Sequence, residues 1–147
     1  MRQHDYRVFA DYFQFYVFDA ETPVDFSEAW SQTAVQQGLT TVPGGVGVAT
    51  ARNMTVPVTV EIHSEPPAAE TGYDRMDECE LRVTSGTLVV MGATDYQPDA
   101  PRLEAAPGTY AVRVYYYGLN TLSPDGLDGS DRYKLVLWPA GRGAGEG

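Results

Sequence analysis

The fold class is decided by the stretch Tyr6-Arg7-Val8-Phe9-Ala10-Asp11-Tyr12-Phe13-Gln14-Phe15-Tyr16-Val17-Phe18. Apolar or aromatic side chains occupy both alternating sets of positions in it. Aromatic and β-branched residues suit a pleated surface, and a strand that is apolar on both faces must be covered on both. The stretch therefore predicts one long strand near the centre of a sheet, with a bend near Asp11.

Outward from this stretch, alternation of apolar and polar residues predicts shorter strands. They lie at 46–52, 54–63, 76–84, 87–91, 102–105, 109–117 and 133–138. Pro57 cannot donate a ladder hydrogen bond, which predicts an edge strand or a bulge for 54–63. Ser85 and Gly86 predict a hairpin between the strands that flank them. We expect an all-β fold, a two-sheet antiparallel β-sandwich of seven or eight strands, with an up-and-down barrel as the alternative.

One segment changes from a strand period to a helical period. Phe26, Trp30 and Ala34 recur at every fourth position, which predicts a single short helix of about three turns. Asp25 or Ser27 would cap its N-terminus and Gly38 would end it. A chain of 147 residues is expected to form a single β-sandwich domain over 1–140, followed by a flexible glycine-rich tail at 141–147.

The charge balance excludes some classes of partner. The chain has 20 Asp and Glu against 10 Lys and Arg, a formal charge of −10. Such a protein repels phosphate backbones and anionic membranes, so we expect no direct nucleic-acid binding and no membrane association. The single Cys79 cannot form an intramolecular disulfide, and no apolar leader precedes the first strand, which predicts a cytoplasmic protein.

The search for catalytic chemistry identifies no candidate residues. The two histidines, His4 and His63, are far apart in the sequence, which does not favour a metal site. The sequence has no Gly-x-Ser-x-Gly motif and no Gly-Lys-Ser/Thr loop, and its single lysine is Lys134. We therefore predict no catalytic residues, no resident metal and no cofactor.

Two acidic clusters are the remaining candidates for a functional site. The first, in the 120–131 loop, contains Asp125, Asp128 and Asp131, and the second contains Asp77, Glu78 and Glu80. Their charges would attract a basic protein partner. The first cluster also has features of a calcium loop, but Leu127 and Val136 occupy the third and twelfth positions, where ligands are needed. A divalent-cation-binding module is therefore kept as an alternative.

The order of motifs resembles the competence protein J family, inhibitors of the DNA-entry nuclease of transformable bacteria. The resemblance rests on 12–18, Thr22-Pro23, Trp30, Gly38-Leu39 and Gly44-Gly45-Val46-Gly47-Val48-Ala49-Thr50-Ala51-Arg52-Asn53. Fainter similarity covers Leu81-Arg82-Val83-Thr84, Pro107-Gly108-Thr109-Tyr110 and Asp131-Arg132-Tyr133-Lys134-Leu135. The resemblance implies a non-enzymatic binding protein.

Together these observations predict a non-enzymatic cytoplasmic binding protein that presents its acidic loops to another protein, a basic nuclease being the leading candidate. The expected contacts are Asp125, Asp128 and Asp131 first, then Asp77, Glu78 and Glu80. A sandwich that binds a carbohydrate-type ligand is the alternative, with Tyr115, Tyr117, Trp138 or Trp30 lining a groove. The partner's identity, the binding surface and the oligomeric state are left open.

Overall fold

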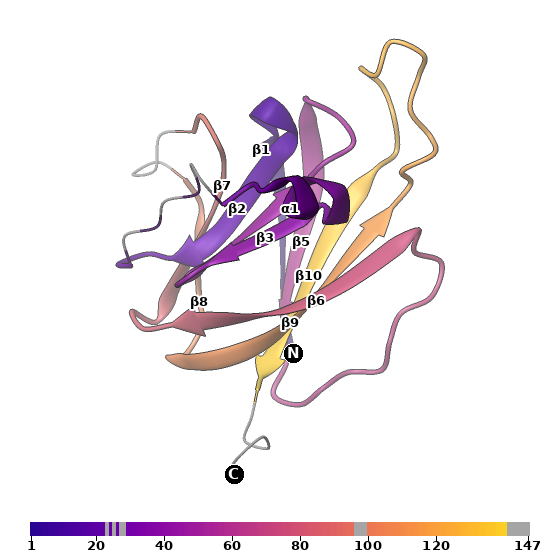
Figure 1. Cartoon of the computed structure of the whole chain (residues 1–147). Coiled ribbons are helices and arrows are strands. Elements are labelled where there is room, and N and C mark those ends of the chain that lie inside the picture. Colours follow the sequence, from indigo (N-terminus) through magenta and orange to yellow (C-terminus); the bar gives the residue numbers. More distant parts are fainter. Residues whose placement is uncertain (23, 25, 27–28, 96–99, 141–147) are drawn as a thin grey trace.

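The computed structural model describes residues 1–22, 24, 26, 29–95 and 100–140, and its strands form two five-stranded sheets. Sheet A has the order β1 (Arg2–Phe9), β5 (Thr55–Ile62), β10 (Arg132–Pro139), β9 (Gly108–Tyr117) and β6 (Arg75–Val83). Sheet B has the order β3 (Leu39–Val42), β4 (Gly45–Ala49), β2 (Gln14–Asp19), β7 (Thr87–Gly92) and β8 (Arg102–Glu104). The two sheets form the layers of a sandwich (Figure 1).

The predicted all-β sandwich is confirmed, but the strand number and the purely antiparallel pairing were wrong. The described part of the chain contains ten strands instead of seven or eight. Sheet A is mixed, because β10 runs parallel to β5 and antiparallel to β9. Two features account for the difference in number: the sequence analysis missed β3, and it joined β1 to β2.

The opening stretch is two strands in different sheets, not one long strand. A short 3-10 turn, η1 (Asp11–Phe13), separates β1 from β2. Inside this turn Tyr12 and Phe13 have φ angles of 59° and 61°, a conformation that redirects the chain. The bend expected near Asp11 is therefore a crossing from sheet A to sheet B.

The core lies between the sheets and explains the apolar alternation. Fully buried aliphatic and aromatic side chains from both sheets meet there, among them Phe15, Val17, Val46, Val60, Val90, Val112, Val114, Tyr116 and Leu135. Successive strand residues point to opposite faces, so every second residue of each strand enters this core. Within the residues described, no helix is both long enough and apolar enough to cross a membrane.

Two local predictions on strand pairing were wrong. Strand β5, which carries Pro57, lies between β1 and β10 instead of at an edge, and its pairing with β1 continues through Pro57 without a bulge. Its pairing with β10 begins at Val58, so only β1 pairs with β5 at the proline. The residues Ser85 and Gly86 do not close a hairpin either, because β6 pairs with β9 whereas β7 pairs with β2 and β8. This connection crosses from one sheet to the other.

Buried Asp19 holds that crossing in place. Its carboxylate accepts hydrogen bonds from the backbone amides of Thr84 and Ser85, each at 2.9 Å, and from the hydroxyl of Thr22 at 2.8 Å. Burial opposes the charged form of Asp19, but the hydrogen bonds from Ser85, Thr22 and Thr84 outweigh it and hold its pKa well below the usual value. The end of β2 is thereby joined to the connection between β6 and β7.

The helix is shorter than predicted. Helix α1 (Gln32–Gln37) is capped by the Ser31 hydroxyl, which accepts a hydrogen bond from the amide of Ala34 at 3.1 Å. Gly38 ends it in a left-handed conformation, as predicted. Trp30 precedes the helix, and the expected caps Asp25 and Ser27 lie outside the described residues, as does the predicted tail at 141–147.

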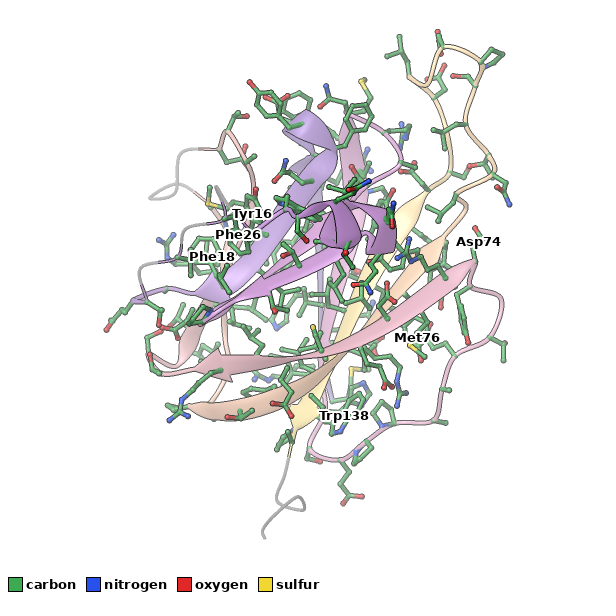
Figure 2. The ribbon with its side chains drawn as sticks, viewed as in Figure 1. Tyr16, Phe18, Phe26, Asp74, Met76 and Trp138 are labelled. Carbon is green, nitrogen blue, oxygen red and sulfur yellow. The ribbon has the colours of Figure 1, made fainter. Side chains whose placement is uncertain are left out.

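The outer face of each sheet is also covered, which explains why strands such as β2 and β9 are apolar on both faces. Tyr16 of β2 stacks on Phe26 with ring centroids 4.1 Å apart, and Figure 2 shows this pair beside Phe18. On sheet A, Tyr115, Tyr117 and Val136 form a second small cluster with Met76 and Trp138. The connection at 63–74 packs against this aromatic cluster of sheet A, where Tyr73 contacts Tyr115.

Candidate functional site

The loop at 118–131, between β9 and β10, carries the two most accessible acids of the first predicted cluster. Figure 1 shows it extending beyond the end of sheet A. The Asp125 carboxylate accepts hydrogen bonds from the Ser123 hydroxyl at 2.5 Å and the Leu127 amide at 3.0 Å. These bonds hold the pKa of Asp125 below its usual value. Asp128 is also exposed, so both acids present negative charge to the solvent.

Asp131, the third predicted contact, does not belong to that surface. It is fully buried, and its Oδ1 lies 2.5 Å from the Nε of Arg52. The Tyr133 hydroxyl donates to its Oδ2 at 2.6 Å and accepts from the Ala51 amide at 2.6 Å. Arg52 also donates to the Leu127 carbonyl at 3.1 Å. The prediction for Asp131 is corrected: this carboxylate anchors the loop to the sandwich.

The second predicted cluster is divided between the two faces of the edge strand β6. In the strand register, Glu78 lies opposite Arg113 of β9 and Glu80 lies opposite Ala111, on the outer face of sheet A. The two glutamates are exposed. Asp77 pairs with Val114, so it points to the opposite face, and it accepts a hydrogen bond from the Arg75 Nε at 3.1 Å. These three acids lie within four residues of one another in the sequence, but they do not share one face of the sheet.

The two acidic clusters also do not merge. Glu80 lies opposite Ala111 on β9, seven residues before Gly118, where the acidic loop begins. At roughly 3.3 Å per strand residue this places Glu80 about 23 Å from the loop base. Asp74 connects the regions, because its carboxylate accepts a hydrogen bond from the Leu119 amide at 2.8 Å. Figure 2 shows Asp74 at the end of β6 nearest the loop.

The structure does not assemble a cation site at this loop. Among the residues described, no three His, Cys, Asp or Glu side chains are arranged to hold a metal ion. The reason at the loop is local, because the carboxylate of Asp131 is buried against Arg52 while those of Asp125 and Asp128 face solvent. The three acids that suggested a calcium loop do not converge.

Two of the four aromatics predicted to line a ligand groove, Tyr115 and Tyr117, are covered by the protein itself. Tyr115 and Tyr117 are 1% and 7% exposed. The connection at 63–74 covers them: the Glu70 amide donates to the Tyr115 hydroxyl at 3.0 Å, and the Tyr117 hydroxyl donates to the Glu70 carboxylate. The guanidinium carbon of Arg113 lies over the Trp138 ring, 4.6 Å from the ring centroid. A ligand groove at Tyr115 and Tyr117 was therefore a wrong prediction, because both rings are buried. Trp138 is half-buried and lines a pocket of about 290 Å³ together with Glu78 and Glu80.

A cluster of buried and half-buried charges holds that connection against sheet A. The ammonium of Lys134 contacts the carboxylates of Glu61, at 2.7 Å, and Glu70. His63 Nε2 lies 2.9 Å from the other Glu61 oxygen. Burial opposes the charged form of Glu61, but the hydrogen bonds from Lys134 and His63 outweigh it and lower the pKa of Glu61. The charges are arranged for mutual pairing, with a structural role.

Cys79 is unsuited to nucleophilic chemistry. Burial, together with the negative charges of Asp77 and Glu80, raises the pKa of the Cys79 thiol to about 12. The thiol is therefore protonated at neutral pH.

Trp30, the fourth aromatic of the predicted ligand groove, lines a pocket of about 370 Å³ at the end of sheet B. The other lining residues are Tyr12, Phe13, Gln14, Val35, Ala49 and Thr50. The sequence analysis assigned Tyr12 and Phe13 to a buried strand. They are instead 68% and 51% exposed, because they lie in η1 and belong to neither sheet. The nearest signal in the sequence was the bend expected at Asp11.

The arrangement of the two sheets is shared with solved structures. The crystal structure of ComJ, inhibitor of the DNA-degrading activity of NucA, from Bacillus subtilis, matches with a TM-score of 0.71 at 14% sequence identity. The match covers 95% of this chain and 96% of ComJ. A second structure, crocagin biosynthetic gene J, matches with a TM-score of 0.64 at 18% identity, covering 96% of this chain and 100% of the other.

The comparisons at the level of sequence found no relatives. The sequence matches no protein-family model and no curated protein. The two structural matches therefore establish a shared two-sheet fold with ComJ and with the crocagin biosynthetic protein.

Proposed function

We propose that this protein is a non-enzymatic inhibitor that binds a basic nuclease and blocks its DNA-binding surface. The observation that carries the proposal is the match to ComJ over 95% of the chain, since ComJ inhibits the DNA-degrading activity of NucA. The formal charge of −10 supports it, because a surface that binds phosphates attracts carboxylates.

The contact surface proposed for this function begins with Asp125 and Asp128. Both acids are exposed on a loop that extends beyond the sheets, and the buried Arg52–Asp131 pair anchors its base. An anchored loop loses less conformational entropy on binding than a mobile one. Glu78 and Glu80 form a second contact region on β6. Asp131 is left out because it is buried, and Asp77 because it is half-buried and paired with Arg75.

The experiment is a DNA-cleavage assay with a NucA-type nuclease from the protein's own host, and with NucA as a second enzyme. We expect the purified protein to slow DNA cleavage in proportion to its concentration. Inhibition should weaken as salt is raised from 50 to about 300 mM, because exposed charges are screened over about 10 Å at 0.1 M salt. Unchanged cleavage of DNA at a ten-fold molar excess of the protein would contradict the proposed function.

Charge reversal tests the contact surface separately. The double variant Asp125→Lys with Asp128→Lys should raise the half-inhibitory concentration by about 100-fold. Reversing these charges replaces attraction to the basic nuclease by repulsion, which slows association and removes the electrostatic complementarity of the interface. The matched control is Glu21→Lys with Glu104→Lys, which changes the net charge equally at exposed positions elsewhere. Equal losses in both double variants would show that net charge acts without a specific acidic contact.

A second candidate function, binding of a small ligand, is favoured by one observation. The pocket beside Trp30 has a volume of about 370 Å³, within the range of ligand sites. A ligand would stabilise the folded state by mass action, so a panel of aromatic and carbohydrate ligands should raise the melting temperature if this function holds. Trp30→Phe is the variant that would reduce the effect.

A further inference from the structure

Part of the wall of the pocket beside Trp30 is formed by apolar side chains that are not buried in the core. Tyr12 and Phe13 form one wall and Val35 of α1, 60% exposed, forms part of another. Exposed apolar side chains that surround a concave site are typical of an interaction surface. The described part of the chain provides no segment that covers them.

The wall formed by η1 is also conformationally costly. Tyr12 and Phe13 both adopt positive φ angles, 59° and 61°, which side chains larger than glycine rarely do. A residue in such a conformation costs roughly 1–3 kcal/mol, and such strain clusters at binding sites. Neither side chain offsets the strain by entering the core, because both are more than half exposed. The turn presents two aromatic rings at a cost to stability.

The pocket is joined to the acidic loop by the segment that follows β4. The Thr50 amide donates to the Phe13 carbonyl at 2.9 Å, and the Thr50 hydroxyl donates to the Arg52 carbonyl at 2.8 Å. Arg52 then binds the loop through the Leu127 carbonyl and Asp131. The pocket wall and the loop anchor are thus two residues apart, at most about 7 Å of chain. Figure 1 shows η1 and the 118–131 loop at the same end of the molecule.

The pocket and the loop differ in chemistry: most of the pocket lining is apolar, and the loop carries the exposed acids Asp125 and Asp128. Leu127 is 52% exposed and lies between Asp125 and Asp128, so the loop adds an apolar side chain flanked by negative charges. Protein interfaces commonly combine an apolar core with a charged rim, and a few anchoring side chains in pockets supply most of their binding energy. The volume of the pocket is within the range of small-ligand sites, but walls this exposed would leave much of an isolated ligand in solvent, so the pocket suits a side chain that is held by a partner protein better.

We propose that the pocket receives an aromatic or large aliphatic side chain of a protein partner, one that lies among lysines or arginines on the partner's surface. The basic residues would contact Asp125 and Asp128 while the apolar side chain packs against Phe13, Trp30 and Val35. The inference rests on the proposed function for the partner's basic character, and it adds a second, apolar element to the recognition.

The test uses a defined probe, so that it does not depend on the identity of the nuclease. The peptide Lys-Lys-Phe-Lys-Lys is titrated into the isotope-labelled protein and followed by NMR, with Lys-Lys-Ala-Lys-Lys and N-acetylphenylalanine amide in parallel. We expect the phenylalanine peptide to shift the signals of Val35, Ala49 and Thr50, and to bind at least ten-fold more tightly than either comparison compound.

Two neutral variants separate the pocket from the charges. Phe13→Gly removes a wall at a position where glycine adopts the positive φ without strain, and Val35→Ser removes an exposed methyl-bearing side chain without changing the net charge. Each should weaken the phenylalanine peptide at least five-fold. Tyr73→Ser, a partly exposed residue on the connection at 63–74, is the matched control and should have no effect.

Several outcomes would overturn the inference. Equal affinity of the two peptides would show that the acids act alone, and equal affinity of N-acetylphenylalanine amide would show a small-ligand site. Shifts confined to residues outside the pocket would place binding elsewhere. A failure of nuclease inhibition combined with pocket-specific peptide binding would contradict only the proposed function. Inhibition that Phe13→Gly and Val35→Ser leave unchanged would contradict only the pocket.

Discussion

Arg52 and Asp131 form an ion pair beneath the acidic loop, with 2.5 Å between Nε and Oδ1 and neither side chain more than 10% exposed. The pair joins the segment after β4 to the residue that precedes β10, and Arg52 also binds the carbonyl of Leu127. Breaking a buried pair by removing one partner leaves an uncompensated charge in a poorly solvated site. The pair is therefore the attachment point of the loop.

The first prediction concerns Asp131→Ala, which leaves the buried guanidinium of Arg52 without its carboxylate partner. It should lower the free energy of unfolding by about 3–5 kcal/mol, the usual cost of breaking a buried ion pair. Urea unfolding followed by fluorescence measures it. The control is Asp128→Ala, which alters an exposed acid of the same loop and should change stability by less than about 0.5 kcal/mol. Similar stabilities for the two variants would contradict the structural role of Asp131.

The second prediction concerns pH and Asp19. Its folded-state pKa is depressed, so its contribution to stability is fully present above the unfolded value of about 4 and is lost as the pH falls toward the lower folded value. The unfolding free energy of the wild type should therefore fall more steeply between pH 5 and 2 than that of Asp19→Asn. At pH 6 the wild type should be the more stable protein by about 1.5–3 kcal/mol, the usual contribution of hydrogen bonds to a charged group. Parallel curves would contradict the assignment.

The third prediction concerns the connection at 63–74. Glu70→Ala removes the carboxylate that binds Lys134 and Tyr117, and should raise amide hydrogen exchange across 64–74 at least ten-fold. The exposed Glu65 provides the matched control, and Glu65→Ala should leave exchange unchanged. If the connection stayed protected in Glu70→Ala, its packing on Tyr115 and Tyr117 would suffice without the charges.

The fourth prediction concerns backbone strain at η1. Tyr12→Gly should leave the unfolding free energy unchanged or raise it by up to about 1 kcal/mol, because glycine relieves the positive φ and an exposed ring contributes little to stability. Tyr16→Gly, in β2, removes a ring stacked on Phe26 and should cost about 3 kcal/mol or more. Thermal and urea unfolding of both variants provide the comparison. A large loss in Tyr12→Gly would mean that the turn is stabilised by its side chain.

The accuracy of sequence reasoning differed between the strands and their pairing. Strands such as β5, β9 and β10 were predicted to within two residues at each end, because alternation is a local property that follows from the pleat. The assignment of partners failed where local signals compete with the tertiary fold. Ser85 and Gly86 have the composition of a hairpin turn, yet the hydrogen bonds of Asp19 hold them in a crossing between sheets.

The candidate site shows the same division. Asp125 and Asp128 could be predicted as exposed acids, since a loop rich in glycine and aspartate is rarely buried. The pocket beside Trp30 could not, because it depends on two positive φ angles at aromatic residues that ordinarily favour a strand.

Local pattern in the chain was enough to predict a layered β fold, an acidic surface loop and a lack of familiar catalytic motifs, because alternation, turn composition and charge are properties of neighbouring residues. The partners of each strand and the burial of Asp131 were decided by the folded chain alone. Asp131 meets Arg52 across 79 positions of sequence, and whether a carboxylate is an exposed contact or a buried anchor depends on which distant group the fold brings to it.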